Sequence, residues 1–458
     1  MVDIATESAV LHRSLSRHFP RIIGGNGIYL FLEDGRRILD ASGGASVACI
    51  GHGNARVQEA IVEQLKTVAY CSTIFYTTQA SEQLCQMLVE STRGKMKRAY
   101  IVSSGSEAME AAMKLARQYF LEKTPAEPQR TRFIAREHSY HGTTLGSLSM
   151  GGHVIRRDKF EPMLLDCVSR VSRCFEFRDK PSEETNEQYV TRLAAELDCE
   201  FQRVGPGTVC AYVMEPIVGA ALGCVPAVDG YVRAVRSICD KYGALLVFDE
   251  VMCGMGRAGT RHAWEHDNIA PDIQTFGKCL GGGYQPIAGL MANGRVIQAL
   301  EDGSGNFAHG HTYQAHPIAC AAALEVQKII QEEKLIQNVS KMGNLLSKRL
   351  HELLDGHPNV GNIRGRGLFW GIEFVKSNVT NTAFPSSLGV AMAIAELGLT
   401  SPYQIAVYPG VGTVDGVEGD HIIISPPYNT TSSEVDIISD TVHRLIHDFF
   451  SSEEIQSW

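Results

Sequence analysis

The sequence predicts an α/β fold with two domains: a large one with a mostly parallel sheet flanked by helices, and a smaller α+β one. The first observation is that short apolar runs alternate with longer amphipathic stretches from about residue 81 to 320, as in parallel sheets covered on both faces. The second is that helical and strand-like stretches of a different pattern follow residue 317. The third is the length: 458 residues are too many for one ordinary core.

The N-terminal segment is predicted to start with a hairpin at 27–40. Two partly alternating runs there flank Asp34 and Gly35, a pair that suits a tight turn. A helix is predicted over 54–68, where apolar residues recur at helical spacing. We assign residues 1–70 to a segment that joins the small domain, 71–320 to the large domain, and 321–458 to the C-terminal small domain.

Four apolar runs predict strands of the large domain: RAYIVSS, TRFIARE, VCAYVMEP and ALLVFDE. Helices are predicted between them at 106–121, 189–203 and 230–242. Beyond residue 317 we expect two long helices, strands within 359–375, a polar linker at 376–388, and further helix and strand. Ligands of parallel sheets bind at the carboxyl ends of the strands, so site residues are expected there.

The composition points to small-molecule partners. The formal net charge is −9 and no block of Lys or Arg occurs, which argues against binding of nucleic acid or an anionic membrane. No stretch of about twenty apolar residues and no signal-like N-terminus is found, so we expect a cytoplasmic protein. The twelve cysteines are scattered and are interpreted as reduced and mostly buried. Four histidines, at 138, 141, 309 and 311, lack a carboxylate or thiol at metal-site spacing, and we expect no metal.

Gly254, Gly256 and Gly259 match the dinucleotide-binding fingerprint, which makes an NAD-dependent oxidoreductase one alternative. That fingerprint requires the glycines to open a helix, and no long helical pattern starts at Gly259. We therefore expect these glycines to form a flexible loop beyond the site.

Two segments at predicted strand ends suggest ligand contacts. Ser104, Gly105 and Ser106 open a helix, where free N–H groups and the helix dipole favour a phosphate. The alternative is that a serine merely caps the helix. Tyr140 and His141 stand on the next loop, where an aromatic ring would stack on a planar ligand, although a lone pair of this kind is more often ordinary packing.

Two charged residues complete the pattern. Asp249 ends a fully apolar strand, so its carboxylate needs a cationic or N–H partner. Lys278 stands between an apolar run and three glycines, an unusual place for a surface charge. An amine, a buried acid, an aromatic ring and a phosphate site together are what pyridoxal 5′-phosphate requires.

The chain resembles the class III aminotransferases of the fold-type I pyridoxal-phosphate enzymes over nearly its whole length. The motifs that carry the resemblance, in family order, are SSGSEA, YHG, MEP, FDEV, FGKCLGGGYQP, HTYQAHPIACAAA and RGRGLFWGIEF. The resemblance implies that Lys278 bonds the cofactor and moves protons, and that Asp249 keeps the pyridine nitrogen protonated. Further cofactor contacts are implied for Ser104, Gly105, Ser106, Tyr140, His141, Glu215, Val251 and Thr312 of the partner subunit. The site would therefore lie at the interface of a homodimer.

Departures from the family pattern indicate the substrate. Thr143 stands where the ornithine and 4-aminobutyrate branches have an arginine, and Ile423 where the ornithine branch has another. The mobile arginine that often precedes GDH is absent, and Glu418 stands in that stretch. We expect ping-pong transfer from an amine or ω-amino acid to an oxo acid, with pyruvate favoured over 2-oxoglutarate. Arg366 is a candidate for binding the acceptor carboxylate, although a structural role is the preferred interpretation. An aminomutase or decarboxylase of the same fold stays open as an alternative.

Overall fold

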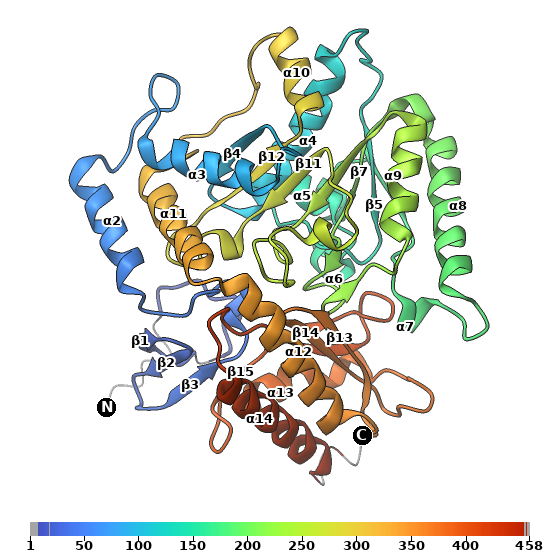
Figure 1. Cartoon of the computed structure of the whole chain (residues 1–458). Coiled ribbons are helices and arrows are strands. Elements are labelled where there is room, and N and C mark those ends of the chain that lie inside the picture. The colour runs from blue at the N-terminus through green and yellow to red at the C-terminus, as the bar shows by residue number, and fades with distance from the viewer. Residues whose placement is uncertain (1–7, 18, 453–454, 456–458) are drawn as a thin grey trace.

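A seven-stranded sheet forms the centre of the structure (Figure 1). The structure is a computed structural model that describes residues 8–17, 19–452 and 455. Six strands of the sheet run parallel, and β12 runs antiparallel to both of its neighbours. In spatial order the strands are β4 (Arg98–Val102), β12 (Ala288–Ala292), β11 (Ile273–Phe276), β10 (Leu245–Asp249), β7 (Val209–Met214), β5 (Arg132–Arg136) and β6 (Val168–Val171). The predicted mostly parallel sheet is confirmed.

Both faces of this sheet are covered by helices, which explains why its central strands are apolar throughout. Along β10, Leu245 and Val247 pack into one core with α4 (Gly105–Glu122) and α10 (Gly294–Asp302). Leu246 and Phe248 pack into a second core with α8 (Asn186–Val204) and α9 (Tyr231–Tyr242). Successive side chains of a strand point to opposite faces, so a strand buried on both faces loses its alternation.

Two smaller sheets complete the lower half of Figure 1. One is antiparallel and consists of β13 (Val360–Arg366), β14 (Phe369–Phe374), β17 (Asp420–Ile424) and β16 (Tyr408–Val411). The other contains β1 (Ile22–Asn26), β2 (Tyr29–Leu32), β3 (Arg37–Asp40) and β15 (Ile405–Ala406). Because β15 pairs parallel with β3, the N-terminal hairpin is joined to a segment more than 360 residues later in the chain.

The remaining helices pack around these sheets. The long ones are α2 (Ala55–Thr67), α3 (Gln79–Ser91), α11 (Pro317–Glu332), α12 (Leu335–Leu354), α13 (Val390–Gly398) and α14 (Ser432–Ser451). The short ones are α1 (Gly43–Ser46), α5 (Leu145–Met150), α6 (Val154–Arg157) and α7 (Glu176–Asp179). No helix among the described residues combines the length and apolarity needed to cross a bilayer.

Most of the predicted elements are confirmed. The predicted hairpin is β2 and β3, with Tyr29 opposite Leu39, and the helices predicted at 54–68, 106–121, 189–203 and 230–242 are α2, α4, α8 and α9. All twelve cysteines are free and eight of them are buried, as expected. Strands β6, β11 and β12 were not predicted.

The prediction of a flexible glycine loop after β10 is wrong. Residues 252–258 are buried. A Cβ at Gly254 would lie 2.8 Å from the backbone oxygen of Glu250, and Gly256 has φ +101°, so the glycines are required by close packing. The short 3₁₀ turn Ala263–His266 follows Gly259 in place of a long helix, so the requirement of the dinucleotide fingerprint is not met.

Candidate active site

A cavity of about 170 Å³ lies where five of the parallel strands end. Segments that follow β4, β5, β7, β10 and β11 supply its lining, which contains Gly105, Ser106, Tyr140, His141, Gly142, Glu215, Asp249, Val251, Met252 and Lys278. Eight of the ten site residues named from the sequence are therefore brought together. The other two are Ser104 and Thr312.

Lys278 follows β11, and its backbone has φ +41°, a strained value for a residue with a side chain. Its Nζ donates a hydrogen bond to the carbonyl oxygen of Ala45, 3.0 Å away. Burial lowers the pKa of Lys278, whereas the charges of Cys279, Asp249 and Glu215 act to raise it. A lowered pKa favours the neutral amine, which is the nucleophilic form.

The carboxylate of Asp249 is fixed by three donors. His141 Nδ1 lies 2.7 Å from Oδ2, while the backbone N–H of Val251 and the hydroxyl of Thr275 donate to Oδ1 at 3.0 and 3.2 Å. The partner expected for this buried acid is thus present. His141 is itself 2 % exposed, and its Nε2 has no hydrogen-bond partner among the described residues. These bonds fix the orientation of the Asp249 carboxylate in the cavity lining.

Glu215 supplies a second buried acid. Its two oxygens accept hydrogen bonds from the backbone N–H groups of Tyr140 and Gly219, each at 3.0 Å. Burial raises the pKa of Glu215, and the nearby charge of Asp249 acts in the same direction. Because it holds the backbone of Tyr140, Glu215 positions the aromatic ring that lines the cavity.

The N-terminus of α4 forms another part of the cavity lining. Ser104 caps the helix by accepting a hydrogen bond from the N–H of Glu107 at 3.2 Å, and it does not line the cavity. The capping alternative therefore describes Ser104. The Ser106 hydroxyl accepts the N–H of Thr143 at 3.0 Å and borders the cavity. A Cβ at Gly105 would lie 2.8 Å from Val251 Cγ1, so only glycine leaves this side of the cavity open.

Thr312 and Arg366 lie elsewhere. Thr312 is exposed and lies outside the cavity of its own chain. Arg366 has its guanidinium 3.4 Å from the ring of His266 and lines a separate cavity that shares no residue with the active-site cavity. Arg366 therefore does not border the cavity around Lys278 in its own chain, and its side chain contacts a histidine ring.

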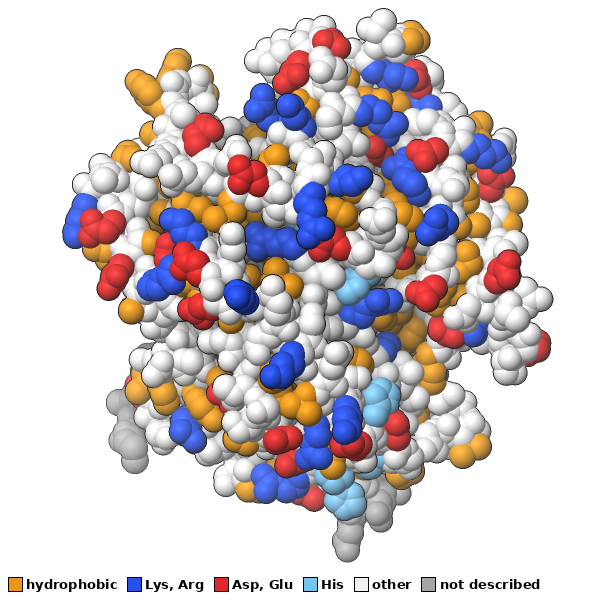
Figure 2. All heavy atoms as spheres, viewed as in Figure 1, with side chains coloured by type: hydrophobic (Ala, Val, Ile, Leu, Met, Phe, Trp, Pro, Cys, Tyr) orange, Lys and Arg blue, Asp and Glu red, His pale blue; other side chains and the backbone are white. Residues whose placement is uncertain are grey.

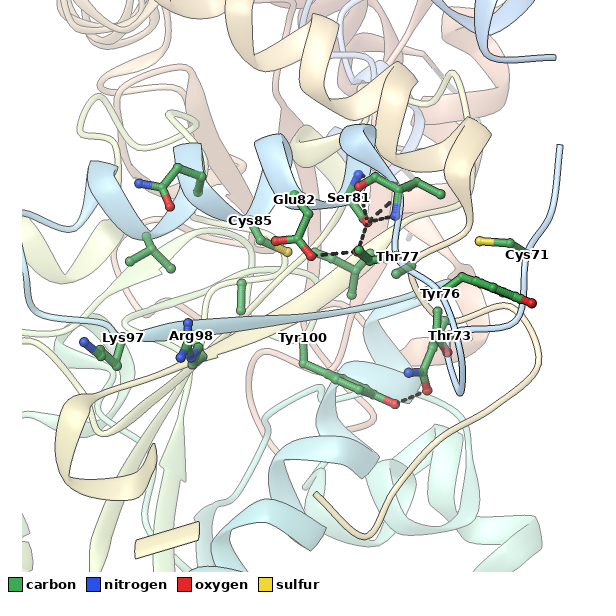
Figure 3. Close-up of a pocket in the computed structure, with 17 residues that line it drawn as sticks. Cys71, Thr73, Tyr76, Thr77, Ser81, Glu82, Cys85, Lys97, Arg98 and Tyr100 are labelled. Carbon is green, nitrogen blue, oxygen red and sulfur yellow. Dashed lines mark hydrogen bonds between the residues drawn. The ribbon is translucent and has the colours of Figure 1, made fainter. Parts of the chain in front are cut away.

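A further cavity of about 410 Å³ lies between α3 and β4 (Figure 3). Its polar side chains bond one another: Thr77 donates to Glu82 at 2.6 Å, and Tyr100 donates to Gln314 at 2.7 Å. Its lysine and its acid, Lys97 and Glu82, come from the residue before β4 and from α3, and not from the carboxyl ends of parallel strands, so the chemistry belongs to the cavity around Lys278.

Sequence reasoning missed three neighbours of the site. Met252 lines the cavity, and Thr275 bonds Asp249 because the parallel register places these residues opposite each other. Arg156 lies with its guanidinium carbon 4.8 Å from the centre of the Tyr140 ring. No signal in the linear sequence distinguishes Arg156 from its neighbour Arg157.

The residues present fit pyridoxal 5′-phosphate. The open space beside Gly105 lies at the N-terminus of an 18-residue helix, which suits a phosphate. A fixed carboxylate and a buried lysine lie across the same cavity, and they match the pyridine nitrogen and the aldehyde of that cofactor.

Comparison with known proteins agrees with this geometry. The model of the aminotransferase class-III family matches residues 15–446. The chain is 50 % identical to an aminotransferase of Gibberella zeae over 93 % of this chain and 83 % of that protein. Among solved structures, an (S)-enantioselective omega-transaminase from Thermomicrobium roseum superposes with a TM-score of 0.90 at 29 % identity, covering 98 % of both chains. An omega transaminase from Pseudomonas jessenii in complex with PMP gives 0.89 at 29 % identity, covering 98 % of this chain and 97 % of that one.

Proposed function

Because the chain belongs to the class III aminotransferases and has their fold-type I architecture, we propose that it uses pyridoxal 5′-phosphate to move an amino group from an amine or ω-amino acid to an oxo acid. The reaction is ping-pong, with pyruvate favoured over 2-oxoglutarate as the acceptor. The observation that carries this proposal is the convergence of Lys278, Asp249 and the α4 N-terminus on one cavity.

Bound pyridoxal phosphate supplies an aldehyde and an electron-withdrawing ring. The α4 N-terminus at Gly105 and Ser106 would bind the phosphate, and Tyr140 and Val251 would enclose the ring. Asp249, oriented by His141, would hold the proton on the pyridine nitrogen. Lys278 Nζ would anchor the cofactor and, once released, take and return the proton at the substrate carbon, a role that its lowered pKa favours.

The surroundings of the cavity support the substrate class. The residue after the YHG motif is Thr143, which carries no positive charge. Its backbone N–H donates a hydrogen bond to the Ser106 hydroxyl. Ile423 lies fully buried in β17, within an apolar cluster. Neither position provides the cation that a second carboxylate on the donor requires. An amine, or an acid whose amino group lies far from its carboxylate, therefore fits best as donor.

An exposed apolar surface supports a homodimer. Ile74, Phe75 and Tyr76 are 82, 76 and 66 % exposed, and they lie on the projecting loop between α2 and α3, where Figure 2 shows hydrophobic side chains protruding. Tyr313 is 59 % exposed, and its ring centre lies 6.1 Å from that of Tyr70 at the start of the same loop. Such a cluster is typical of an interaction surface. Thr312, the neighbour of Tyr313 in the sequence, is also exposed. A residue that contributes to the site of a partner subunit must be exposed in its own chain.

A donor and acceptor panel tests the function. Addition of a suitable amine should remove the visible-edge absorbance band of the lysine-bound cofactor, and pyruvate should restore it faster than 2-oxoglutarate does. Lys278→Ala should abolish turnover while the circular dichroism spectrum stays unchanged. Transamination by that variant at the wild-type rate would contradict the assignment.

The panel also separates the alternatives. Release of carbon dioxide from the donor would identify a decarboxylase, and isomerisation of one substrate without a second would identify an aminomutase. Nicotinamide absorbance in place of the band would contradict the proposal altogether.

A further inference from the structure

Arg156 is a cation beside the active-site cavity. It lies in α6, and its guanidinium carbon is 4.8 Å from the centre of the ring of Tyr140, which lines the cavity. Its charge acts on two of the residues that line the cavity. It lowers the pKa of Tyr140 against the larger opposite effect of burial, and it adds to the burial that lowers the pKa of Lys278. Through its contact with Tyr140, Arg156 lies beside the cavity that Lys278 also lines, although 122 positions separate Arg156 from Lys278 in the sequence.

Among the described residues, no acid pairs with this guanidinium, and no hydrogen bond involves the Arg156 side chain, which lies over the ring of Tyr140. The two acids of the cavity are engaged elsewhere: Asp249 by His141, and Glu215 by two backbone N–H groups. The adjacent His153 is uncharged at neutral pH, because burial and the charge of Arg156 lower its pKa to about 4.

The neighbouring Arg157 shows what a structural arginine does in the same helix. Its guanidinium donates to the carbonyl oxygens of Leu148, Ser149 and Gly151 at 2.8 to 3.0 Å and pairs with Glu161. These bonds fix α6 against α5. Arg156 is thus carried by an anchored helix while its own donors stay free, which is the arrangement expected of a group that binds a ligand.

We propose that Arg156 binds the carboxylate of the oxo-acid acceptor. The proposal rests on the proposed function and deepens it, because it supplies the cation missing at Thr143, Ile423 and the stretch before GDH. A guanidinium presents two parallel N–H donors that match a carboxylate. An amine donor has no carboxylate and does not need this contact. With such a donor, Arg156 is engaged in the acceptor half-reaction only, so one site accepts both substrates.

The test separates the two half-reactions in the holoenzyme. Arg156→Gln removes the charge and Arg156→Lys keeps it without the paired donors. The rate of the donor half-reaction is followed with 1-phenylethylamine, which carries no carboxylate, and the acceptor half-reaction with pyruvate. The Kd of propionate, an unreactive carboxylate, is measured by calorimetry on the resting enzyme. Arg132→Gln is the matched control, because Arg132 is exposed at the start of β5, opposite to the strand end that bears the site.

Arg156→Gln should raise the KM for pyruvate and the Kd of propionate about 10- to 100-fold, the usual effect of losing hydrogen bonds to a charged group. Arg156→Lys should recover part of this loss. The donor half-reaction should change much less, because Arg156 acts there only through the pKa of Lys278, on which burial has the larger effect. Arg132→Gln and Arg366→Gln should change neither the pyruvate KM nor the propionate Kd.

A further variant, Arg13→Gln, is measured in the same way, because the charge of Arg13 also acts on Tyr140. Three results would overturn the proposal: an unchanged pyruvate KM and propionate Kd in Arg156→Gln, an equal loss in both half-reactions, or a loss in Arg13→Gln that Arg156→Gln does not show. Failure of the proposed function is a distinct outcome, namely a wild-type enzyme that converts no amine. The propionate Kd then still decides whether Arg156 binds a carboxylate.

Discussion

Replacement of Gly105 by alanine tests the cavity geometry most directly. The new Cβ would lie 2.8 Å from Cγ1 and 3.3 Å from Cγ2 of Val251, both well inside ordinary contact distance. Overpacking of this kind costs about 1–3 kcal/mol. If Val251 moves into the cavity to relieve the clash, cofactor binding weakens by the same free energy, and the Kd of pyridoxal phosphate rises about 5- to 150-fold.

Gly294 offers the matched control. Like Gly105 it is the first residue of a helix, preceded by a side chain that caps the helix, but a Cβ at Gly294 meets nothing within 4 Å. Gly294→Ala should therefore be neutral or stabilise by about 0.4–1 kcal/mol. Urea unfolding of the cofactor-free proteins and titration with pyridoxal phosphate measure both quantities. If Gly105→Ala behaves like Gly294→Ala in both, the tight wall between Gly105 and Val251 is not as described.

Two other substitutions have defined outcomes. Asp249→Asn keeps the size of the side chain but removes its charge, so the single-turnover rate with an amine should fall about 10²- to 10³-fold, and an unchanged rate would exclude the proposed role of Asp249. Burial lowers the pKa of His421 to about 3, whereas a histidine in the unfolded chain has a pKa near 6.5. The unfolded chain therefore binds more protons, and the free energy of unfolding falls as the pH drops below 6.5. Between pH 7.5 and 5.5, protonation of His421 in the unfolded chain should lower the free energy of unfolding by about 1.4 kcal/mol. His421→Leu should lack this part of the pH dependence of stability measured by urea unfolding. An equal pH dependence in both proteins would contradict the lowered pKa of His421.

Much of the fold and most of the cofactor site could be predicted because both follow local rules. Apolar runs such as that ending at Asp249 mark buried strands, and parallel strands bring their ends to one edge. The missed strands β6 and β11 are short and carry polar residues such as Ser169, Gln274 and Thr275, so their pattern is weak.

The role of Arg156 could not be predicted because its position beside Tyr140 depends on how α6 is placed. That placement is fixed by the hydrogen bonds of Arg157 to distant carbonyl oxygens. Equally, the tight packing of the glycines after β10 depends on what surrounds them in space. Such features are set by contacts between distant segments, which a linear pattern does not contain.

The pairing of β3 with β15 has a consequence for synthesis of the protein on the ribosome. Strand β3 (residues 37–40) pairs in parallel with residues 405–406. Ala45, whose carbonyl oxygen accepts the hydrogen bond from Lys278 Nζ, follows β3 closely in the sequence. The first fifty residues therefore leave the ribosome long before the strand that pairs with β3 has been translated. A nascent chain that stops before residue 405 carries Lys278, Asp249 and the whole central sheet, yet it lacks the strand that holds the N-terminal hairpin against the site.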